Sequence, residues 1–167
     1  ISPVTLFGPN TLKVKDYLKL AKTFYKNWDQ EYADELIKMF NLNVKKRVHK
    51  LSKGMLSAVT IILALASKAE ITILDEPVAG LDVIAREQFY KLVIEEYANT
   101  GRTFIISTHI IEEAASLFEK VIMIDNGEIV LEENTDDLLA RAYRVSGEDV
   151  QVDEAVNGFK VYHPESV

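Results

Sequence analysis

The heptapeptide "ITILDEP" at Ile71–Pro77 places two carboxylates directly after a short apolar run. The run is rich in β-branched residues and bounded by charge, which is typical of a strand buried on both faces of a parallel sheet. A carboxylate at the end of such a strand needs a partner, because burying an unpaired charge is costly. Mg²⁺ is a natural partner, since it binds one or two carboxylates together with phosphate oxygens.

The two acids have different predicted roles. An apolar strand that ends in Asp is the Walker B pattern of nucleotide hydrolases, which makes Asp75 a candidate Mg²⁺ ligand. Glu76 follows it and is placed to orient and deprotonate an attacking water. The same letters also fit a strand that simply ends in two solvated acids, and the heptapeptide alone does not separate these readings.

Helical and strand patterns alternate around this stretch. Helical spacing and capping residues predict helices over residues 14–25, 29–40, 52–66, 83–98, 110–118 and 135–143. Short apolar runs predict strands over residues 71–75, 103–108, 120–125 and 129–133, with hairpin chemistry in "NGE" at 126–128. A helical front followed by alternating strands and helices predicts an α/β fold with a parallel sheet, whose ligands lie near the carboxyl ends of the strands.

Two further polar residues follow predicted strands or turns. His109 closes "IISTH" just past an apolar strand, where an imidazole can hydrogen-bond a phosphate or a water. A structural histidine with satisfied hydrogen bonds is the plainer reading. Asp82 in "AGLD" follows the acid pair on a turn, and the cap of the next helix explains it equally simply.

The stretch "LSKGM" at Leu51–Met55 opens an apolar helix. Ser52 offers a hydroxyl and free backbone N–H groups at the helix start, which are the ingredients of an anion site. Gly54 permits close approach of the backbone to a phosphate. Ordinary helix capping accounts for the same residues when the stretch is considered alone.

Composition excludes several classes of function. A net charge of -7 argues against a general nucleic-acid binder, which needs clustered Lys and Arg. The absence of cysteine excludes disulfide scaffolds, thiolate zinc sites and Cys nucleophiles. The longest apolar run, Ala58–Ala66, is too short to cross a bilayer, and no signal peptide is expected at the first residues.

Taken in order, "LSKGM", "ITILDEP", "AGLD" and "STH" resemble the ATPase subunit of ATP-binding cassette (ABC) transporters. The resemblance covers about Leu12 to Tyr143. "LSKGM" is similar to the family's LSGGQ signature, with Lys53 and Met55 replacing Gly and Gln. "ITILDEP" is similar to its Walker B with the adjoining glutamate, "AGLD" to its D-loop and "STH" to its switch histidine. The nearest branch is the bacterial exporter group with bacitracin-type and acetoin-type ATPases, where "LSKGM" and a short C-terminal extension are familiar.

The resemblance implies a role for each matched residue. Two ATPase subunits of the family pair head to tail and trap two ATP molecules. Asp75 would hold Mg²⁺, Glu76 would be the general base and His109 would contact the γ-phosphate. Asp82 would couple the two sites across the dimer. Ser52 and Gly54 would contact ATP bound to the opposite subunit, with Lys53 adding charge near its phosphate and Met55 giving up a polar side chain.

The resemblance also implies fold, partners and location. The expected fold is a partial P-loop NTPase core with a parallel sheet and flanking helices, plus an α-helical subdomain at the front. Residues 1–66 would hold a Q-loop remnant and the helical subdomain, residues 67–144 part of the catalytic core, and residues 145–167 the start of an extension. The parent would use transmembrane permease subunits to power export, lie on the cytoplasmic face of the membrane through them, and bind no nucleic acid.

One family motif is absent from these 167 residues. The family cradles phosphates with G-x-x-x-x-G-K-[ST], and no Gly in this sequence is followed by Lys. The Q-loop glutamine would fall near Ser2 or Pro3, and neither residue replaces it. The chain is therefore expected to be the rear portion of the ATPase and inactive alone.

Two other classes of protein share parts of this pattern. A naturally short, non-catalytic partner would lend only its signature face to a complete ATPase, but it would not need both Glu76 and His109. An ATPase head of the chromosome-maintenance or DNA-repair type would be interrupted by a long coiled coil. The chain has no heptads before the signature, and its acidic charge also disfavours that type.

Overall fold

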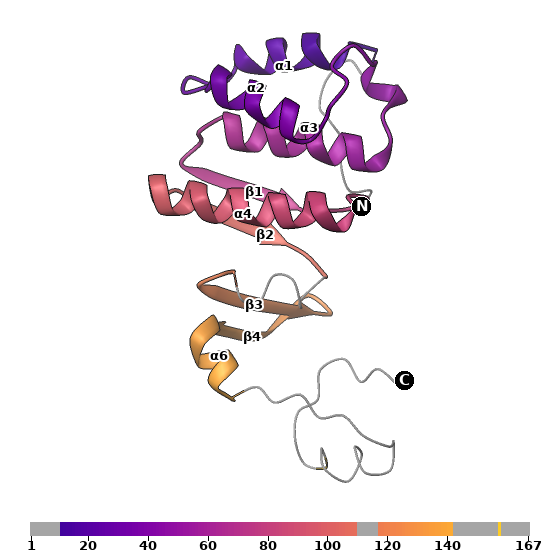
Figure 1. Ribbon diagram of the computed structural model, residues 1–167. Helices are drawn as coiled ribbons and strands as arrows, with labels where there is room; N and C mark the ends of the chain where they lie inside the picture. Colours follow the sequence, from indigo (N-terminus) through magenta and orange to yellow (C-terminus); the bar gives the residue numbers. More distant parts are fainter. Residues whose placement is uncertain (1–10, 110–116, 142–156, 158–167) are drawn as a thin grey trace. The chain divides into compact units, whose positions relative to one another are not determined.

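The computed structural model describes residues 11–109, 117–141 and 157. The chain divides into two compact units, one up to Leu117 and one from Phe118. The first unit begins with four helical elements: α1 (Val14–Lys22), α2 (Gln30–Met39), the short 3₁₀ helix η1 (Val48–Lys50) and α3 (Lys53–Ala66). It continues with β1 (Ile71–Asp75), α4 (Val83–Thr100) and β2 (Thr103–Ser107), as Figure 1 shows.

Three helices begin at the side-chain caps that the sequence predicts. Asp29 accepts a hydrogen bond from the backbone N–H of Tyr32 at the start of α2. Ser52 does the same for Met55 at the start of α3, and Asp82 for Ala85 at the start of α4. Gly101 ends α4 with φ of 65°, the left-handed conformation that glycine adopts without steric cost.

The first helix is shorter than predicted, because it ends at Lys22 rather than Tyr25. The Thr23 hydroxyl donates to the Leu20 carbonyl over 2.7 Å, and the Phe24 N–H donates to the Ala21 carbonyl over 2.9 Å. Such contacts three residues apart tighten the chain and close the helix. Phe24 therefore lies beyond the helix, and 77% of it is exposed.

The strands β1 and β2 pair in parallel, as predicted, with Asp75 opposite Ser107. One face of the pair is buried, through Thr72 and Leu74 on β1. The prediction of burial on both faces is wrong for the described residues, since Ile71 and Ile73 are 62% and 73% exposed. Side chains alternate across a strand, so these residues share the uncovered face with Asp75.

The core of the first unit is centred on α3. This helix is apolar on nearly all sides and packs between the α1 and α2 layer and the layer that contains α4 (Figure 1). The largest fully buried apolar side chains come from four helices and the turn after β1; they are Val14, Leu36, Val59, Ile61, Ile62, Leu65, Val78 and Phe89. The helical front and the strand pair therefore share one core.

A buried ion-pair network joins the ends of these elements. Glu96 on α4 contacts Lys68 over 2.7 Å and Arg102, just before β2, over 2.9 Å. Lys68 also lies 4.1 Å from the centre of the Tyr32 ring on α2. Burial and the neighbouring Glu96 charge raise the pKa of Tyr32, and burial lowers the pKa of Arg102 against the opposing effect of Glu96.

The second unit contains an antiparallel hairpin and a helix. β3 (Lys120–Asp125) pairs with β4 (Glu128–Asn134), and α6 (Thr135–Arg141) follows. Asn126 and Gly127 have φ of 48° and 84°, as a tight hairpin turn requires. The predicted helix over 110–118 lies almost entirely outside the described residues, as do residues 142 and 143 of the last predicted helix. The extension at 145–167 has only Asn157 among the described residues, and the three domain bounds stay predictions.

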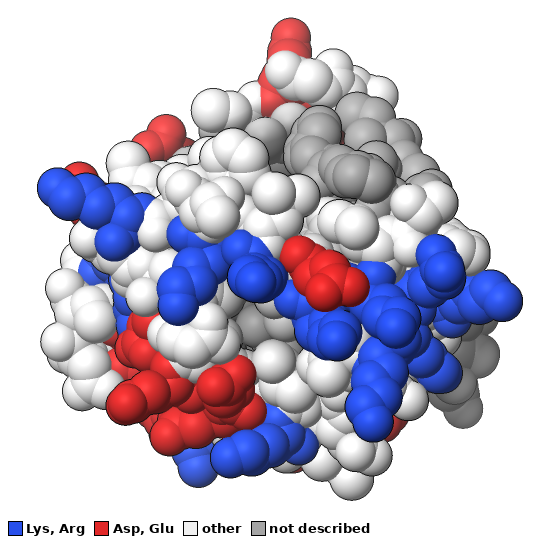
Figure 2. All heavy atoms as spheres, turned by 90° about the horizontal axis from the view of Figure 1, so that it is seen from above, with Lys and Arg blue, Asp and Glu red and all other residues white. Residues whose placement is uncertain are grey.

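Charge is unevenly distributed over the first unit. Figure 2, which views the molecule from the α1 side, shows Lys and Arg side chains crossing this face and a separate group of Asp and Glu side chains beside them. Within the described part of the chain, no helix has the length and apolar character needed to span a membrane.

We predict that Glu96→Leu lowers the free energy of unfolding by about 3–5 kcal/mol, because it leaves the buried Arg102 guanidinium without its counter-charge. Urea denaturation of the 167-residue chain measures this loss. Glu95→Leu is the matched control, since Glu95 is exposed on the same helix. It should change stability by less than about 0.5 kcal/mol. Equal effects of the two substitutions would contradict the assignment.

Candidate active site

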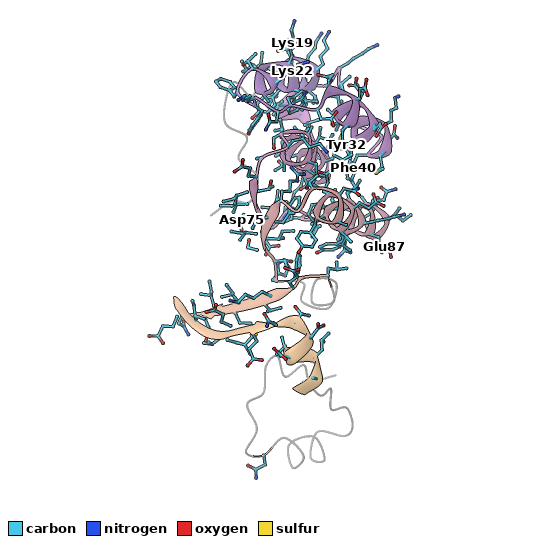
Figure 3. The ribbon with its side chains drawn as sticks, turned by 90° about the vertical axis from the view of Figure 1, so that its left-hand side faces the viewer. Lys19, Lys22, Tyr32, Phe40, Asp75 and Glu87 are labelled. Atoms are coloured by element: carbon cyan, nitrogen blue, oxygen red, sulfur yellow. The ribbon has the colours of Figure 1, made fainter. Side chains whose placement is uncertain are left out.

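The carboxyl ends of β1 and β2 bring Asp75 and Ser107 together. The parallel register places the two residues side by side, and the Ser107 hydroxyl donates a hydrogen bond to Asp75 Oδ1. Asp75 remains exposed at this edge of the strand pair (Figure 3). A carboxylate and a hydroxyl at the end of parallel strands form an oxygen-rich edge that faces incoming ligands.

Glu76 leaves the strand in an unusual backbone conformation. Its φ is 45°, in the left-handed region that non-glycine residues rarely adopt. The Glu76 N–H donates to the Ser107 carbonyl over 3.0 Å, which continues the pairing of the strands by one more residue. This hydrogen bond between the strands keeps Glu76 in its strained conformation. The conformation directs the Glu76 side chain toward the segment after β2.

His109 holds one oxygen of the Glu76 carboxylate. The His109 backbone N–H donates to Glu76 Oε1 over 3.1 Å, and the His109 Nδ1 atom lies 2.7 Å from the same oxygen. The other oxygen, Oε2, is buried and has no hydrogen-bond partner among the described residues. The carboxylate is thus fixed in orientation through one oxygen, while the second makes no hydrogen bond with the described residues.

The start of α3 packs closely against the turn that follows Glu76. The Ser57 hydroxyl donates to the Ala79 carbonyl over 2.7 Å. A Cβ atom added to Gly54 would lie only 2.3 Å from the Gly80 carbonyl oxygen. Gly54 therefore has a role that the sequence did not suggest, because it lets α3 approach the 76–82 turn within its own chain.

A groove of about 400 Å³ lies where these two segments meet. The start of α3 contributes Ser52, Gly54 and Met55 to its walls, and the turn contributes Asp82. Lys53 is exposed, and its Cβ and Cγ atoms lie against Gly80. The sequence-predicted residues thus form two groups, one at this groove and one at the strand ends, and the 76–82 turn connects them.

Ser52 and Asp82 both act as helix caps, which was the plainer reading of each. The Asp82 carboxylate accepts from the Ala85 N–H over 2.8 Å, and the Ser52 hydroxyl accepts from the Met55 N–H over 3.2 Å. Their predicted contacts with nucleotide remain predictions. The Lys46 ammonium lies 3.8 Å from the Met55 sulfur, so a basic side chain reaches the start of α3 from the preceding connection.

The residues around Asp75 supply some, but not all, of the ligands of a Mg²⁺ site. Its exposed carboxylate and the Ser107 hydroxyl are hard oxygen donors of the kind that Mg²⁺ prefers. No cluster of three or more His, Asp or Glu side chains suited to a metal occurs among the described residues. A single carboxylate is nevertheless compatible with Mg²⁺, which commonly keeps waters and substrate phosphates as its other ligands.

Two residues at the site were missed by the sequence analysis. Ser107 lies beside Asp75, and Ser57 connects α3 to the turn. Ser107 was visible as the first letter of "STH", and pairing "ITILD" with "TFIIS" in parallel register would have placed it opposite Asp75. Ser57 carries no such signal, because its partner is a backbone carbonyl 22 residues away.

We predict that Gly54→Ala destabilises the first unit by about 1–3 kcal/mol, since the added methyl group overlaps the Gly80 carbonyl. Urea denaturation of the 167-residue chain measures the change. Lys53→Ala, in the same exposed helical turn, is the control and should remain within about 0.5 kcal/mol of wild type. If the two variants unfold at the same urea concentration, the close packing of Gly54 does not contribute to stability.

Comparison with protein families finds similar sequences among ATP-binding proteins. A family described as "AAA domain, putative AbiEii toxin, Type IV TA system" matches residues 30–115, about half of the chain. An uncharacterized ABC transporter ATP-binding protein of Nostoc is 29% identical over 143 residues, which is 80% of this chain and 42% of that protein. The taurine import ATP-binding protein TauB of Roseobacter denitrificans is 38% identical over 80 residues, which is 48% of this chain and 30% of that protein. The chain thus spans less than half of the length of these relatives.

Solved structures show the same fold. The ATP-binding cassette MJ0796, in a dimeric post-hydrolysis state bound to ADP and Pi, is 26% identical with a TM-score of 0.65. That match covers 76% of this chain and 58% of the cassette. An ATP-binding subunit of an ABC transporter superposes with a TM-score of 0.71 over 84% of this chain and 60% of its own length, at 24% identity. The chain therefore belongs to the AAA-domain family that matches residues 30–115, and it is similar in sequence and fold to ATP-binding domains of ABC transporters.

Proposed function

We propose that this chain is the catalytic rear part of the ATP-binding subunit of an ABC transporter, in which Glu76 activates the water that hydrolyses ATP. The observation that supports this most strongly is the Glu76 carboxylate itself. His109 holds one of its oxygens, and the other is buried without a hydrogen-bond partner among the described residues. A carboxylate that is held in one orientation at the carboxyl ends of two parallel strands has the placement that a general base needs.

The chemistry follows from this arrangement. The Glu76 carboxylate accepts a proton from water while the water oxygen forms a bond to the γ-phosphorus. The bond between the γ-phosphorus and the bridging oxygen breaks, and its electron pair leaves with ADP, so that ATP and water become ADP and phosphate. His109 holds Glu76 in orientation and lies at the edge where the γ-phosphate would be bound.

Asp75 is the proposed Mg²⁺ ligand, and Ser107 orients its carboxylate through the hydroxyl hydrogen bond. When bound, Mg²⁺ neutralises the charge that develops on the phosphate oxygens. Asp75 suits this role because it is exposed at the carboxyl edge of β1, beside Glu76 but on the opposite side of the strand from the buried Leu74.

The groove at the start of α3 is the proposed surface for a second ATPase subunit. Ser52, Lys53 and Gly54 would contact ATP held by that subunit, with Met55 lining the same wall. The free N–H groups at the start of α3 and the exposed Lys53 both favour an anionic group there. Asp82 lies on the opposite wall, where it would couple the two nucleotide sites of a head-to-tail dimer.

Transmembrane permease subunits are the other proposed partners, and they would hold the ATPase at the cytoplasmic face of the membrane. Export remains the proposed direction of transport, on the basis of "LSKGM" and the branch that it resembles. The names of relatives do not decide the direction, because those that match include an ATP-binding protein for taurine import. Substrate choice would belong to the permease.

The 167-residue chain should bind MgATP only weakly by itself. Its sequence contains no G-x-x-x-x-G-K-[ST], the loop whose N–H groups and lysine hold the triphosphate. Isothermal titration calorimetry with MgATP tests this expectation. Binding in the micromolar range would refute it and would require another phosphate site within these residues.

Glu76→Gln should lower kcat for ATP hydrolysis about 10²–10⁴-fold in a complete ATPase that contains this chain, while ATP binding is kept. The amide preserves the shape of the side chain but cannot accept the proton from water. The measurements are steady-state ATPase activity and equilibrium binding of ATP.

The control for this variant is Glu87→Gln. Glu87 is an exposed carboxylate on α4, outside the two groups of site residues (Figure 3). Its substitution should leave kcat within about twofold of wild type. A Glu76→Gln enzyme with the activity of the Glu87→Gln enzyme would show that Glu76 is not the base. The chain would then fit the non-catalytic partner considered above.

A further inference from the structure

A ridge of lysines runs along the outer face of α1. Lys15, Lys19 and Lys22 follow one another at intervals of four and three residues, and Lys26 continues the series in the turn after the helix. This spacing places the helical members along one side of α1, and all three are exposed. Lys19 and Lys22 project from α1 away from β1 and Asp75 (Figure 3).

The connection between α2 and α3 extends this ridge. It carries Lys45, Lys46 and Arg47, all exposed. Its backbone is attached to the start of α1, since the Val14 N–H donates to the Lys46 carbonyl over 2.9 Å and the Lys15 N–H to the Val44 carbonyl over 3.0 Å. We call the lysines of the ridge and the three residues of the connection the basic band.

Aromatic side chains project at one end of the basic band. Phe24 is 77% exposed, although a phenyl ring in a folded chain is normally buried. Tyr25 beside it is 41% exposed and stacks on Trp28 with ring centres 6.3 Å apart. Lys22 and Lys26 flank Phe24 in sequence, so an apolar tip lies among positive charges.

The charges of the ridge have no partners among the described residues. No carboxylate lies within ion-pair distance of Lys15, Lys19 or Lys26, and Lys22 contacts only the amide oxygen of Gln30 over 3.5 Å. Residues 13–53 hold eleven of the 19 Lys and Arg of the chain but five of its 26 Asp and Glu. Three of these five acidic residues lie on α2, and they are Glu31, Asp34 and Glu35.

We infer that the basic band and the exposed Phe24 form a surface that binds an anionic lipid bilayer. Exposed lysines around a projecting aromatic ring complement a membrane interface, because the lysines meet lipid phosphates while the ring enters the headgroup layer. This inference goes beyond the proposed function, because it requires neither ATP nor the catalytic residues.

The test uses vesicles of phosphatidylcholine with and without phosphatidylserine, and the 167-residue chain. Trp28 is the only tryptophan in the chain and stacks on Tyr25 in the turn that carries Phe24, so its fluorescence reports on this turn. Vesicles with phosphatidylserine should bind the chain and shift the Trp28 emission to shorter wavelength. Phosphatidylcholine alone should do neither, and added salt should release the chain.

Two variants define the surface. Neutralising Lys15, Lys19 and Lys22 together as Gln should weaken binding about a hundredfold, since each lysine near an anionic surface contributes about fivefold. Phe24→Ser should weaken it about tenfold by removing the inserted ring. Circular dichroism checks that both variants keep the helical content of wild type.

The control variants test whether binding depends on this surface or on exposed charges and apolar residues elsewhere. Lys91→Gln with Lys120→Gln removes two exposed charges outside the basic band, and Ile73→Ser reduces the uncovered apolar face of β1. Both should bind vesicles as wild type does. The inference is overturned if the wild-type chain does not bind vesicles with phosphatidylserine, which is the result expected for a surface that binds a protein instead. It is equally overturned if the wild-type chain binds vesicles with and without phosphatidylserine to the same extent. It is also overturned if the ridge and Phe24 variants bind like wild type.

Discussion

The parallel pairing of β1 with β2 is the constraint on which the candidate site depends. It places Asp75 beside Ser107 and continues one residue further, through the hydrogen bond from the Glu76 N–H to the Ser107 carbonyl. That bond holds Glu76 in a left-handed conformation and directs its carboxylate to His109. The register of the strand pair thus sets the orientation of the proposed base, because a slip of one residue would send Glu76 to the other face.

The turn from Glu76 to Asp82 connects the strand pair to α3 and α4 in the first unit. The start of α3 contacts two carbonyls of this turn. The Ser57 hydroxyl donates to the Ala79 carbonyl, and Gly54, which has no side chain, packs against the Gly80 carbonyl. The turn ends at Asp82, which caps α4. The base and the groove at the start of α3 are therefore fixed by one short segment, so displacement of the turn at either end would alter both. Such a connection suits an enzyme that must sense nucleotide on two surfaces.

Local signals in the sequence predicted most of the fold. Asp29, Ser52 and Asp82 begin helices as expected, and the parallel pairing of residues 71–75 with 103–107 follows from alternating strands and helices. Features that depend on packing were not predicted. Thr23 closes α1 early through the hydrogen bond from its hydroxyl to the Leu20 carbonyl, and only the three-dimensional approach of α3 to Gly80 explains Gly54. The uncovered face of β1 also escaped prediction, because an apolar run does not reveal which residues cover it.

In the proposed function, the strand ends and the start of α3 are parts of two nucleotide sites in a dimer. The most direct measurement is a crystal structure of the complete ATPase that contains this chain, with Glu76→Gln and MgATP. The account predicts that Ser52 and Gly54 of one subunit contact the triphosphate held by the other, while the side chain at position 76 contacts a water beside the γ-phosphorus. Nucleotide bound away from the start of α3, with position 76 turned from the γ-phosphate, would contradict it.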